Sequence, residues 1–221
     1  MSTAYLVSCP NATCTVPTAY RDAFPGAEET LASSEGWEPG TLNIAQGFAM
    51  RLRTPLVHGD VTRLLIDLEQ DGEQRWSRFS RKLPESIRAK IAERHAAKYY
   101  DTLRRRIAIE VARCAQIVHL MIHTSPETDG VRLTTGQDET LAAEIATRWR
   151  SLLVNAGITA TTHVEPTSVL QAAITPEETS GKLRAIRFTA GQSFFLAGKP
   201  LRWETFKKLT LDTFVQAMSA N

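Results

Sequence analysis

Long apolar runs, cysteine and an excess of charge of one sign are all scarce in this sequence of 221 residues. No run approaches the roughly 20 apolar residues of a membrane span, so we expect no membrane partner. Lys plus Arg number 26 and Asp plus Glu number 24, and this net charge of +2 gives no electrostatic case for nucleic acid. Three cysteines form no disulfide framework, and no basic segment precedes an apolar stretch near Met1, so we expect a cytoplasmic protein.

The composition is that of an ordinary globular protein, with 43% hydrophobic and 23% charged residues. A chain of this length buries a sizeable core without disulfides or a structural metal. The sequence has no internal repeat and no low-complexity linker. We therefore expect one domain over residues 1–221.

Strand and helix patterns alternate along the chain, which predicts an α/β layered domain with a mostly parallel sheet. The near-continuous apolar run at 117–123 indicates a central strand. We expect residues 124–137 to be an elaborated loop. Asp138 is expected to cap a helix whose buried stripe holds Leu141, Ile145, Trp149 and Leu152. The other predicted strands are 5–9, 55–58, 63–68, 158–163 and 182–190, and the predicted helices are 42–52, 84–114 with a break near Tyr99 and Tyr100, 138–155 and 200–218.

The predicted strand ends suggest where a ligand would bind. In open α/β sheets the site lies outside the carboxyl ends of the strands. This places residues 10–14, 67–70, 123–127 and 190–192 around one crevice.

Several short motifs occur in a fixed order. They are VSC at 7–9, VP at 16–17, FPGAEE at 24–29, GWEPG at 36–40, TRLLIDL at 62–68, then His119 and His123 on the predicted central strand, and IRFTAGQ at 186–192. In order and spacing this set resembles the N-formylglutamate amidohydrolase family. The resemblance implies a zinc-exopeptidase-like fold, a three-layer α/β/α sandwich with a mostly parallel or mixed sheet. It also implies a divalent metal such as zinc at the strand ends and hydrolysis of a small N-acyl amide.

The sequence departs from the family pattern at the positions that carry this chemistry. Asn11 stands where the family has a metal-binding histidine, and an amide is a poor zinc ligand. Glu69 and Gln70 replace an Asn-Arg pair expected to hold a carboxylate, so an acidic substrate would be repelled there. Arg187 and Thr189 replace an acidic pair that includes the expected general base. These losses predict a pseudoenzyme that acts as a binding or partner protein.

Under that interpretation the pocket binds a small molecule, a peptide or a protein partner without a metal. Ala12-Thr13 stand where the resemblance implies a Gly-Gly pair, and Glu38 stands where it implies an aspartate after Gly-Trp. The predicted pocket residues are Asn11, Thr13, Glu38, Arg63, Glu69, Gln70 and Arg187.

An alternative keeps the chain an active hydrolase of a different N-acyl or peptide substrate, breaking an amide C–N bond. One version rebuilds the metal site around His123 and Glu38. The other makes Cys14 a thiolate nucleophile activated by His123, with Asp67 orienting the imidazole. Against these stand simpler interpretations, in which Cys14 is a buried thiol and His123 a hydrogen-bonded core histidine.

Three further points stay open at this level. Asp67 either orients a group of the pocket or forms a structural ion pair with Arg63. Arg187 faces the crevice or the outer surface, because a slip of one residue in register exchanges the two faces. A third role is assembly, with a homo-oligomer formed through the amphipathic helix at 200–218.

Overall fold

The computed structural model describes residues 2–166, 176–196 and 200–219. Over these ranges the chain forms a six-stranded sheet with strand order β2-β1-β3-β6-β4-β5. The sheet is mixed: β4 runs antiparallel to β6, and every other neighbouring pair is parallel. The strands are β1 (Thr3–Cys9), β2 (Leu56–His58), β3 (Gln116–Ser125), β4 (Val131–Gly136), β5 (Ala160–Glu165) and β6 (Leu183–Gly191).

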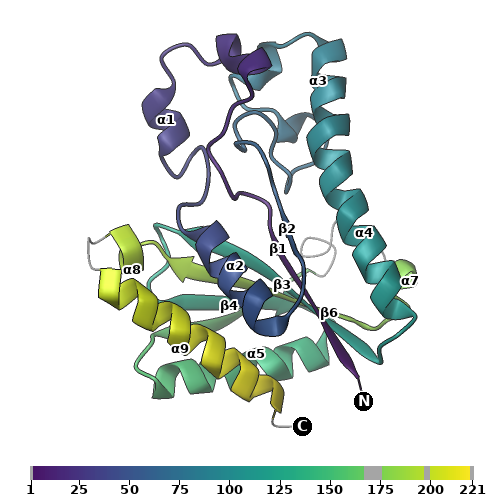
Figure 1. Ribbon diagram of the computed structural model, residues 1–221, viewed down its shortest axis with the longest axis vertical. Helices are drawn as coiled ribbons and strands as arrows, with labels where there is room; N and C mark the ends of the chain where they lie inside the picture. The colour runs from purple at the N-terminus through teal and green to yellow at the C-terminus, as the bar shows by residue number, and fades with distance from the viewer. Residues whose placement is uncertain (1, 167–175, 197–199, 220–221) are drawn as a thin grey trace.

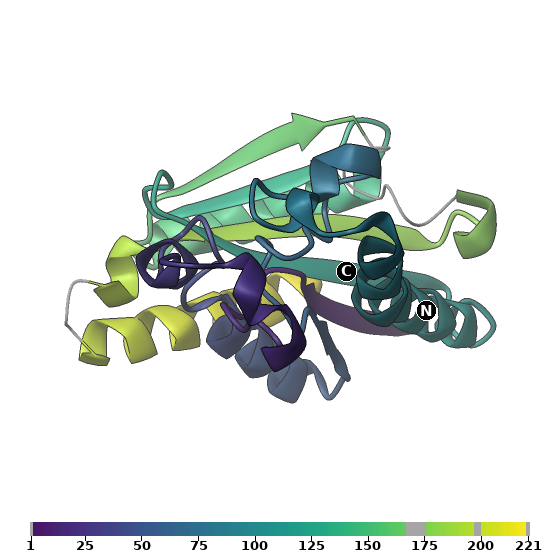
Figure 2. The same cartoon turned by 90° about the horizontal axis from the view of Figure 1, so that it is seen from above.

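Helices cover both faces of this sheet, so the predicted three-layer α/β/α sandwich is confirmed (Figures 1 and 2). The longer helices are α2 (Thr41–Leu52), α3 (Glu85–Ile91), α4 (Lys98–Val111), α5 (Thr140–Asn155) and α9 (Pro200–Ser219). Shorter helical segments are Thr18–Ala23, α1 (Glu28–Ala32), Gly72–Arg75, Ser80–Lys82, α7 (Pro176–Thr179) and α8 (Ser193–Leu196).

One face of the sheet packs on α2, α5 and α9, which lie close together in Figure 1. Alternate residues of β3, including Leu120 and Ile122, point into this layer and are fully buried. Trp149 of α5 is its largest fully buried side chain. It stacks on Phe188 of β6 with ring centroids 5.3 Å apart and meets Phe214 of α9 edge-on. This layer is the main hydrophobic core.

The opposite face packs on α4, which continues from α3 as one rod (Figure 1). A π-helical segment, Ala92–Ala97, joins the two helices in place of the break predicted near Tyr99 and Tyr100. π-helical turns are rare and are often found at functional sites. Tyr99 is buried against this face, beside the end of the sheet that carries the polar side chains described below.

Two strand predictions differ from the structure. Residues 63–68 form turns, because Leu65, Ile66 and Leu68 are buried by packing under α3 and α4 and not by sheet pairing. Residues 131–136, predicted as loop, form β4, whose Thr134 and Thr135 are buried like apolar strand residues. Strand formation there depends on pairing with β5 and β6, which is not visible in the local sequence.

The helix start predicted at Asp138 is also wrong. The residue at the N-terminal cap of α5 is Glu139, and no side chain caps the helix. At both ends of the helix the buried residue is one position later than predicted. Ala142 is buried in place of Leu141, which is 47% exposed, and Leu153 is fully buried in place of Leu152. Ile145 and Trp149 keep their predicted places in the core.

Gly59 follows β2 where the backbone passes close to the end of β1. Its amide donates to the carbonyl oxygen of Cys9 over 3.0 Å, and a Cβ at this position would lie 1.9 Å from the carbonyl oxygen of Pro10. Gly59→Ala is therefore expected to lower the free energy of unfolding by about 1–3 kcal/mol in urea titrations. Gly47→Ala, in α2, is the control, because a Cβ there makes only ordinary contacts with Leu211 and Lys207 of α9 and should stabilise by about 0.5–1 kcal/mol. Equal stability of both variants would contradict the close approach.

None of the helices in the described ranges combines the length and the apolar character needed to cross a bilayer.

Candidate functional site

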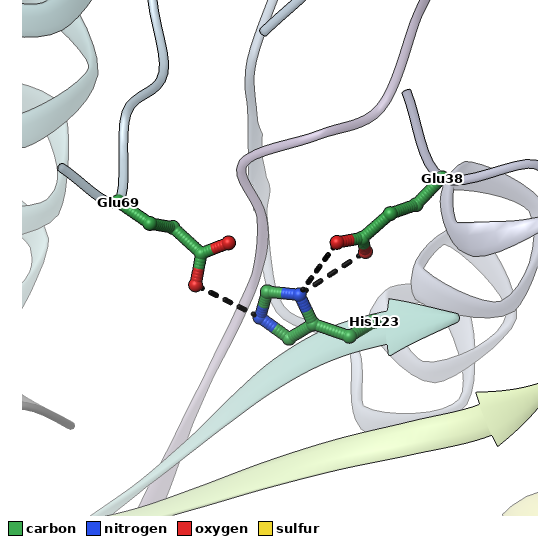
Figure 3. A group of neighbouring side chains, drawn as sticks. All are labelled: Glu38, Glu69 and His123. Carbon is green, nitrogen blue, oxygen red and sulfur yellow. Dashed lines mark hydrogen bonds and ion pairs between the residues drawn. The ribbon is translucent and has the colours of Figure 1, made fainter. Parts of the chain in front are cut away.

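His123 lies near the end of β3 with its imidazole between two glutamates (Figure 3). Its Nδ1 is 3.1 Å and 3.2 Å from the two carboxylate oxygens of Glu38. Its Nε2 is 3.6 Å from Oε1 of Glu69. The side chain of His123 is only 7% exposed, and that of Glu38 only 8%. The three residues come from separate parts of the chain, and the end of the sheet brings them together.

Glu38 is fixed by the backbone on both sides of it. Its amide donates to the carbonyl oxygen of Asn11, and its Oε2 accepts from the amide of Thr124. Arg63 lies 3.7 Å from Oε1 of Glu38 and also donates to the carbonyl oxygen of Ser34 in the preceding loop. Arg63 thus holds the loop that carries Glu38, and among the described residues it forms no direct ion pair with Asp67.

Glu69 is positioned by a turn that Asp67 closes. Oδ1 of Asp67 accepts a hydrogen bond of 2.9 Å from the amide of Glu69, and burial raises the pKa of Asp67. Asn11 is buried, and its side-chain nitrogen Nδ2 donates to Oε2 of Glu69 over 2.8 Å and to Oε1 of Glu38 over 3.0 Å. Asn11 therefore bridges the two carboxylates, at the position where the resemblance implies a histidine ligand.

Arg187 points toward this cluster. In the pairing of β3 with β6, His123 lies opposite Thr189, so both side chains point to the same face of the sheet. Arg187 is two residues before Thr189 and therefore lies on that face too. The Arg187 guanidinium is 3.7 Å from Glu69 and 2.8 Å from Glu165 of β5. Glu165 was not predicted as a site residue. It lies two residues beyond the strand predicted at 158–163, and only the pairing of β4 with β5 brings it near Arg187.

Opposite charges dominate the electrostatics of the cluster. Burial alone would lower the pKa of His123, but the carboxylates of Glu69 and Glu38 outweigh it and raise this pKa. Burial would raise the pKa of Glu38, but His123, Arg63 and Asn11 outweigh it and lower the pKa. Without a metal, the two carboxylates therefore favour the protonated, imidazolium form of His123.

The same side chains fit a divalent metal ion. Glu38, Glu69 and His123 each offer a ligand atom, and these atoms lie within 4.8 Å of one another. Zinc takes carboxylate oxygens and imidazole nitrogens at roughly 2.0–2.2 Å in tetrahedral geometry, so two ligand atoms of one ion lie about 3.4 Å apart. Glu38 faces Nδ1 of His123 and Glu69 faces Nε2, so one ion would bind all three residues only with the imidazole turned until one ring nitrogen faces both carboxylates. Three protein ligands with one open position form the common arrangement of catalytic zinc sites.

Glu69 also lines a cleft of about 380 Å³ beside the π-helical segment. Tyr100, Ala96, Asp71 and Arg75 also line it. Pockets for small molecules usually measure roughly 300–1,000 Å³. Of the three clustered side chains, Glu69 is in the lining of this cleft, and Glu38 and His123 are not.

The remaining predicted site residues lie apart from this cluster. The hydroxyl of Thr13 bonds that of Thr15 within its own loop, and the side chain of Gln70 is exposed. Cys14 is partly exposed. Both ring nitrogens of His123 face glutamates, and no hydrogen bond joins the Cys14 thiol to His123 in the described ranges. The predicted thiol and imidazole pair is not formed in this structure.

His119 lies deeper in β3 and serves the fold. Its Nε2 contacts the hydroxyl of Ser8 over 2.8 Å, and burial lowers its pKa from 6.5 to about 4. As the pH falls below about 6.5, the unfolded chain binds a proton at this position while the folded protein does not. The free energy of unfolding should therefore fall by up to about 3 kcal/mol between pH 7 and pH 4, measured by urea titration.

The variant His119→Gln should lose that part of the pH dependence, because glutamine does not titrate. His163→Gln, at an exposed histidine of β5, should keep it. Identical pH profiles for all three proteins would contradict the assignment of His119 as a neutral buried group.

Comparison with solved structures places the fold. The crystal structure of gene product Atu2144 from Agrobacterium tumefaciens matches 98% of this chain and 90% of its own, with a TM-score of 0.79 and 16% identity. N-formylglutamate amidohydrolase from Ralstonia eutropha matches 98% of this chain and 94% of its own, with a TM-score of 0.69 and 13% identity. The chain has an N-formylglutamate amidohydrolase-like fold. The resemblance predicted from the motifs is thus confirmed for the fold.

No protein-family model matches the chain, and no curated protein matches it by sequence. The amidohydrolase-like fold is therefore established by structure alone. Activity has to be argued from the side chains of this chain.

Proposed function

We propose that this protein hydrolyses a small N-acyl amide, using a divalent metal ion held by Glu38, Glu69 and His123. The observation that carries the proposal is the convergence of these three ligand atoms within 4.8 Å at the end of the sheet. Glu69 compensates for the histidine missing at Asn11, since it brings a carboxylate to the same place. The departure at position 69 is then a replacement ligand and not a loss of function.

A metal ion bound there would polarise the amide carbonyl and lower the pKa of a bound water. The chain supplies the other parts of the reaction. Arg187 lies 3.7 Å from Glu69 and so offers a cation for the negative charge that develops on the carbonyl oxygen. Oε2 of Glu69, the oxygen that faces Asn11, takes the proton of the attacking water and passes it to the leaving nitrogen. A C–O bond forms, the C–N bond breaks, and an acid and an amine are released.

Glu69, one of the three proposed ligands, lines a cleft of about 380 Å³, a volume within the range of small-molecule pockets. The burial of His123 and Glu38 keeps bulk water from the reacting groups, which strengthens electrostatic interactions there.

The test is release of free amine from a panel of N-formyl and N-acetyl amino acids by protein purified without a metal-binding tag. We expect hydrolysis that a chelator removes and that zinc or manganese restores. His123→Gln should abolish it, whereas the matched variant His163→Gln, on exposed β5, should leave it unchanged. Hydrolysis that persists in the chelated protein would contradict the proposal.

A second candidate is a binding protein that holds its ligand in the same pocket without hydrolysis. It is favoured by Arg187, which stands where the resemblance implies an acidic residue and which pairs with Glu165 over 2.8 Å. Together with Arg63 and the His123 imidazolium it balances the carboxylates without a metal. Ligand binding in the pocket with no release of amine, even with zinc or manganese present, would favour this candidate.

A further inference from the structure

A row of three side chains runs from the glutamate and histidine cluster across the sheet. β6 lies between β3 and β4, and its Thr189 pairs with His123 on one side and with Arg132 on the other. Residues directly opposite one another in paired strands point to the same face. His123, Thr189 and Arg132 therefore share the face that carries Glu69 and Arg187.

Two buried hydroxyls along this row lack a hydrogen-bond partner in the parts of the chain that the structure describes. Thr189 is 3% exposed and Thr128 is 9% exposed, and neither Oγ1 is bonded. Gly191 lies two residues after Thr189, so a Cβ at Gly191 would point to the same face as Thr189. Such a Cβ would lie 2.4 Å from the carbonyl oxygen of Thr128, so the backbone of Thr128 crosses that face. Unpaired buried hydroxyls are costly, and a bound ligand group is one reason to keep them.

Arg132 is the cation of this row without a partner. Within residues 2–166, 176–196 and 200–219 it forms no hydrogen bond or ion pair, although it is only partly exposed. Arg187, by contrast, already holds Glu165 and Glu69. An arginine presents five donors in a planar fork that matches a carboxylate, so a free one beside a reactive site is suited to hold an anionic group.

We propose that Arg132, with the hydroxyls of Thr189 and Thr128, binds a carboxylate of the substrate. The proposal rests on the proposed function, since it places the amide of the same molecule at Glu38, Glu69 and His123. Neighbouring strands lie about 4.8 Å apart, so the backbones of Arg132 and His123 are separated by roughly 10 Å. The side chain of Arg132 is long enough to span part of this interval. The distance that remains matches the short separation between the acyl carbonyl and the carboxylate of an N-acyl amino acid.

The site favours a carboxylate over a phosphate. Glu69 and Glu165 stand on the same face and repel a doubly charged anion more strongly than a singly charged one. The structure thus keeps recognition of an acidic substrate but moves it. The cation lies on β4, across β6 from His123, and not at Gln70, where the family resemblance implies one.

The test uses two probes that resist hydrolysis, N-methylsulfonylglycine and its carboxamide, together with inorganic phosphate. Calorimetry of the full chain should show the acid binding about 10- to 100-fold more tightly than the carboxamide, as expected for charge-assisted hydrogen bonds. Arg132→Gln should remove this preference. Arg106→Gln, at an exposed arginine of α4, should keep it.

The threonines provide a second arm. Thr189→Val should weaken binding of the acid, and Thr189→Ser, which retains the hydroxyl, should bind it like the unmodified protein. Equal binding of acid and carboxamide, no binding of the acid, or an unchanged preference in Arg132→Gln would each overturn the proposal. Phosphate that binds more tightly than the acid would overturn the assignment of a carboxylate.

Failure here can be told apart from failure of the proposed function. Binding of the acid through Arg132 without any amide hydrolysis leaves the carboxylate site standing and removes the hydrolase. Metal-dependent hydrolysis that is equally fast for N-acetylglycine and N-acetylglycinamide, in the unmodified protein and in Arg132→Gln, removes the carboxylate site and leaves the hydrolase.

Discussion

Glu69→Gln is expected to lower the affinity for zinc or manganese by more than about 100-fold and to reduce hydrolysis to background. Residues of the outer shell typically change metal affinity by about 10- to 100-fold, and a direct ligand should matter more. The change replaces a carboxylate oxygen by a neutral amide, which is a poor ligand. It also leaves Arg187 and His123 with one anion fewer.

Glu165→Gln is the matched control. Glu165 pairs with Arg187 over 2.8 Å, and Glu69 lies 3.7 Å from the same guanidinium. Unlike Glu69, Glu165 does not belong to the group of potential metal ligands. Its loss should leave metal affinity within a few-fold of the unmodified protein. Competition with a chelating dye measures both variants. Equal losses in the two would mean that Glu69 acts only through Arg187, and would remove it from the metal site.

Trp149→Ala is expected to lower the free energy of unfolding by about 3–5 kcal/mol in urea titrations. The indole is fully buried, stacks on Phe188 and meets Phe48 and Phe214 edge-on. Its Nε1 also donates to the hydroxyl of Thr213 over 3.1 Å. Folded proteins are stable by only about 5–15 kcal/mol, so this loss would leave the protein marginal.

Thr213→Val separates the hydrogen bond from the packing. It leaves the indole ring in place and removes its acceptor, together with the hydroxyl's own bond to the carbonyl oxygen of Leu209. A loss of about 1–3 kcal/mol is expected, mainly for the unpaired buried indole donor. A Trp149→Ala loss below about 1 kcal/mol would contradict the role of this side chain as the centre of the α2, α5 and α9 layer.

The elements with strong local patterns were predictable from the sequence. The apolar run at 117–123 could be placed as a central strand because burial on both faces leaves no polar alternation. β4 could not, because its threonines are buried only through pairing with β5 and β6. Residues 63–68 show the converse, since an apolar run buried by tertiary packing does not have to be a strand.

The candidate site was predictable in its parts more than in its arrangement. Asn11, Glu38, Glu69 and Arg187 were predicted pocket residues, and the structure brings them together around His123. Glu69 was interpreted as the loss of a substrate clamp. Only the fold shows that its carboxylate reaches His123, because the turn closed by Asp67 sets its direction.

Two residues show what the local sequence leaves open, Cys14 and Arg132. Cys14 follows Asn11 closely in sequence, but Thr13 and Thr15 bond each other and form a local turn there. Arg132 was not predicted as a site residue, because it lies in a segment predicted as loop. Its relation to His123 depends on two strand registers, which no local pattern encodes.

The metal content of the protein purified without a metal-binding tag tests the central claim most directly. Elemental analysis should give about one zinc, manganese or iron ion per chain, retained in Glu165→Gln and lost in Glu69→Gln and His123→Gln. A protein free of metal, with no uptake after incubation with zinc or manganese, would contradict a metal site at Glu38, Glu69 and His123. It would leave the imidazolium paired with two carboxylates as the functional state.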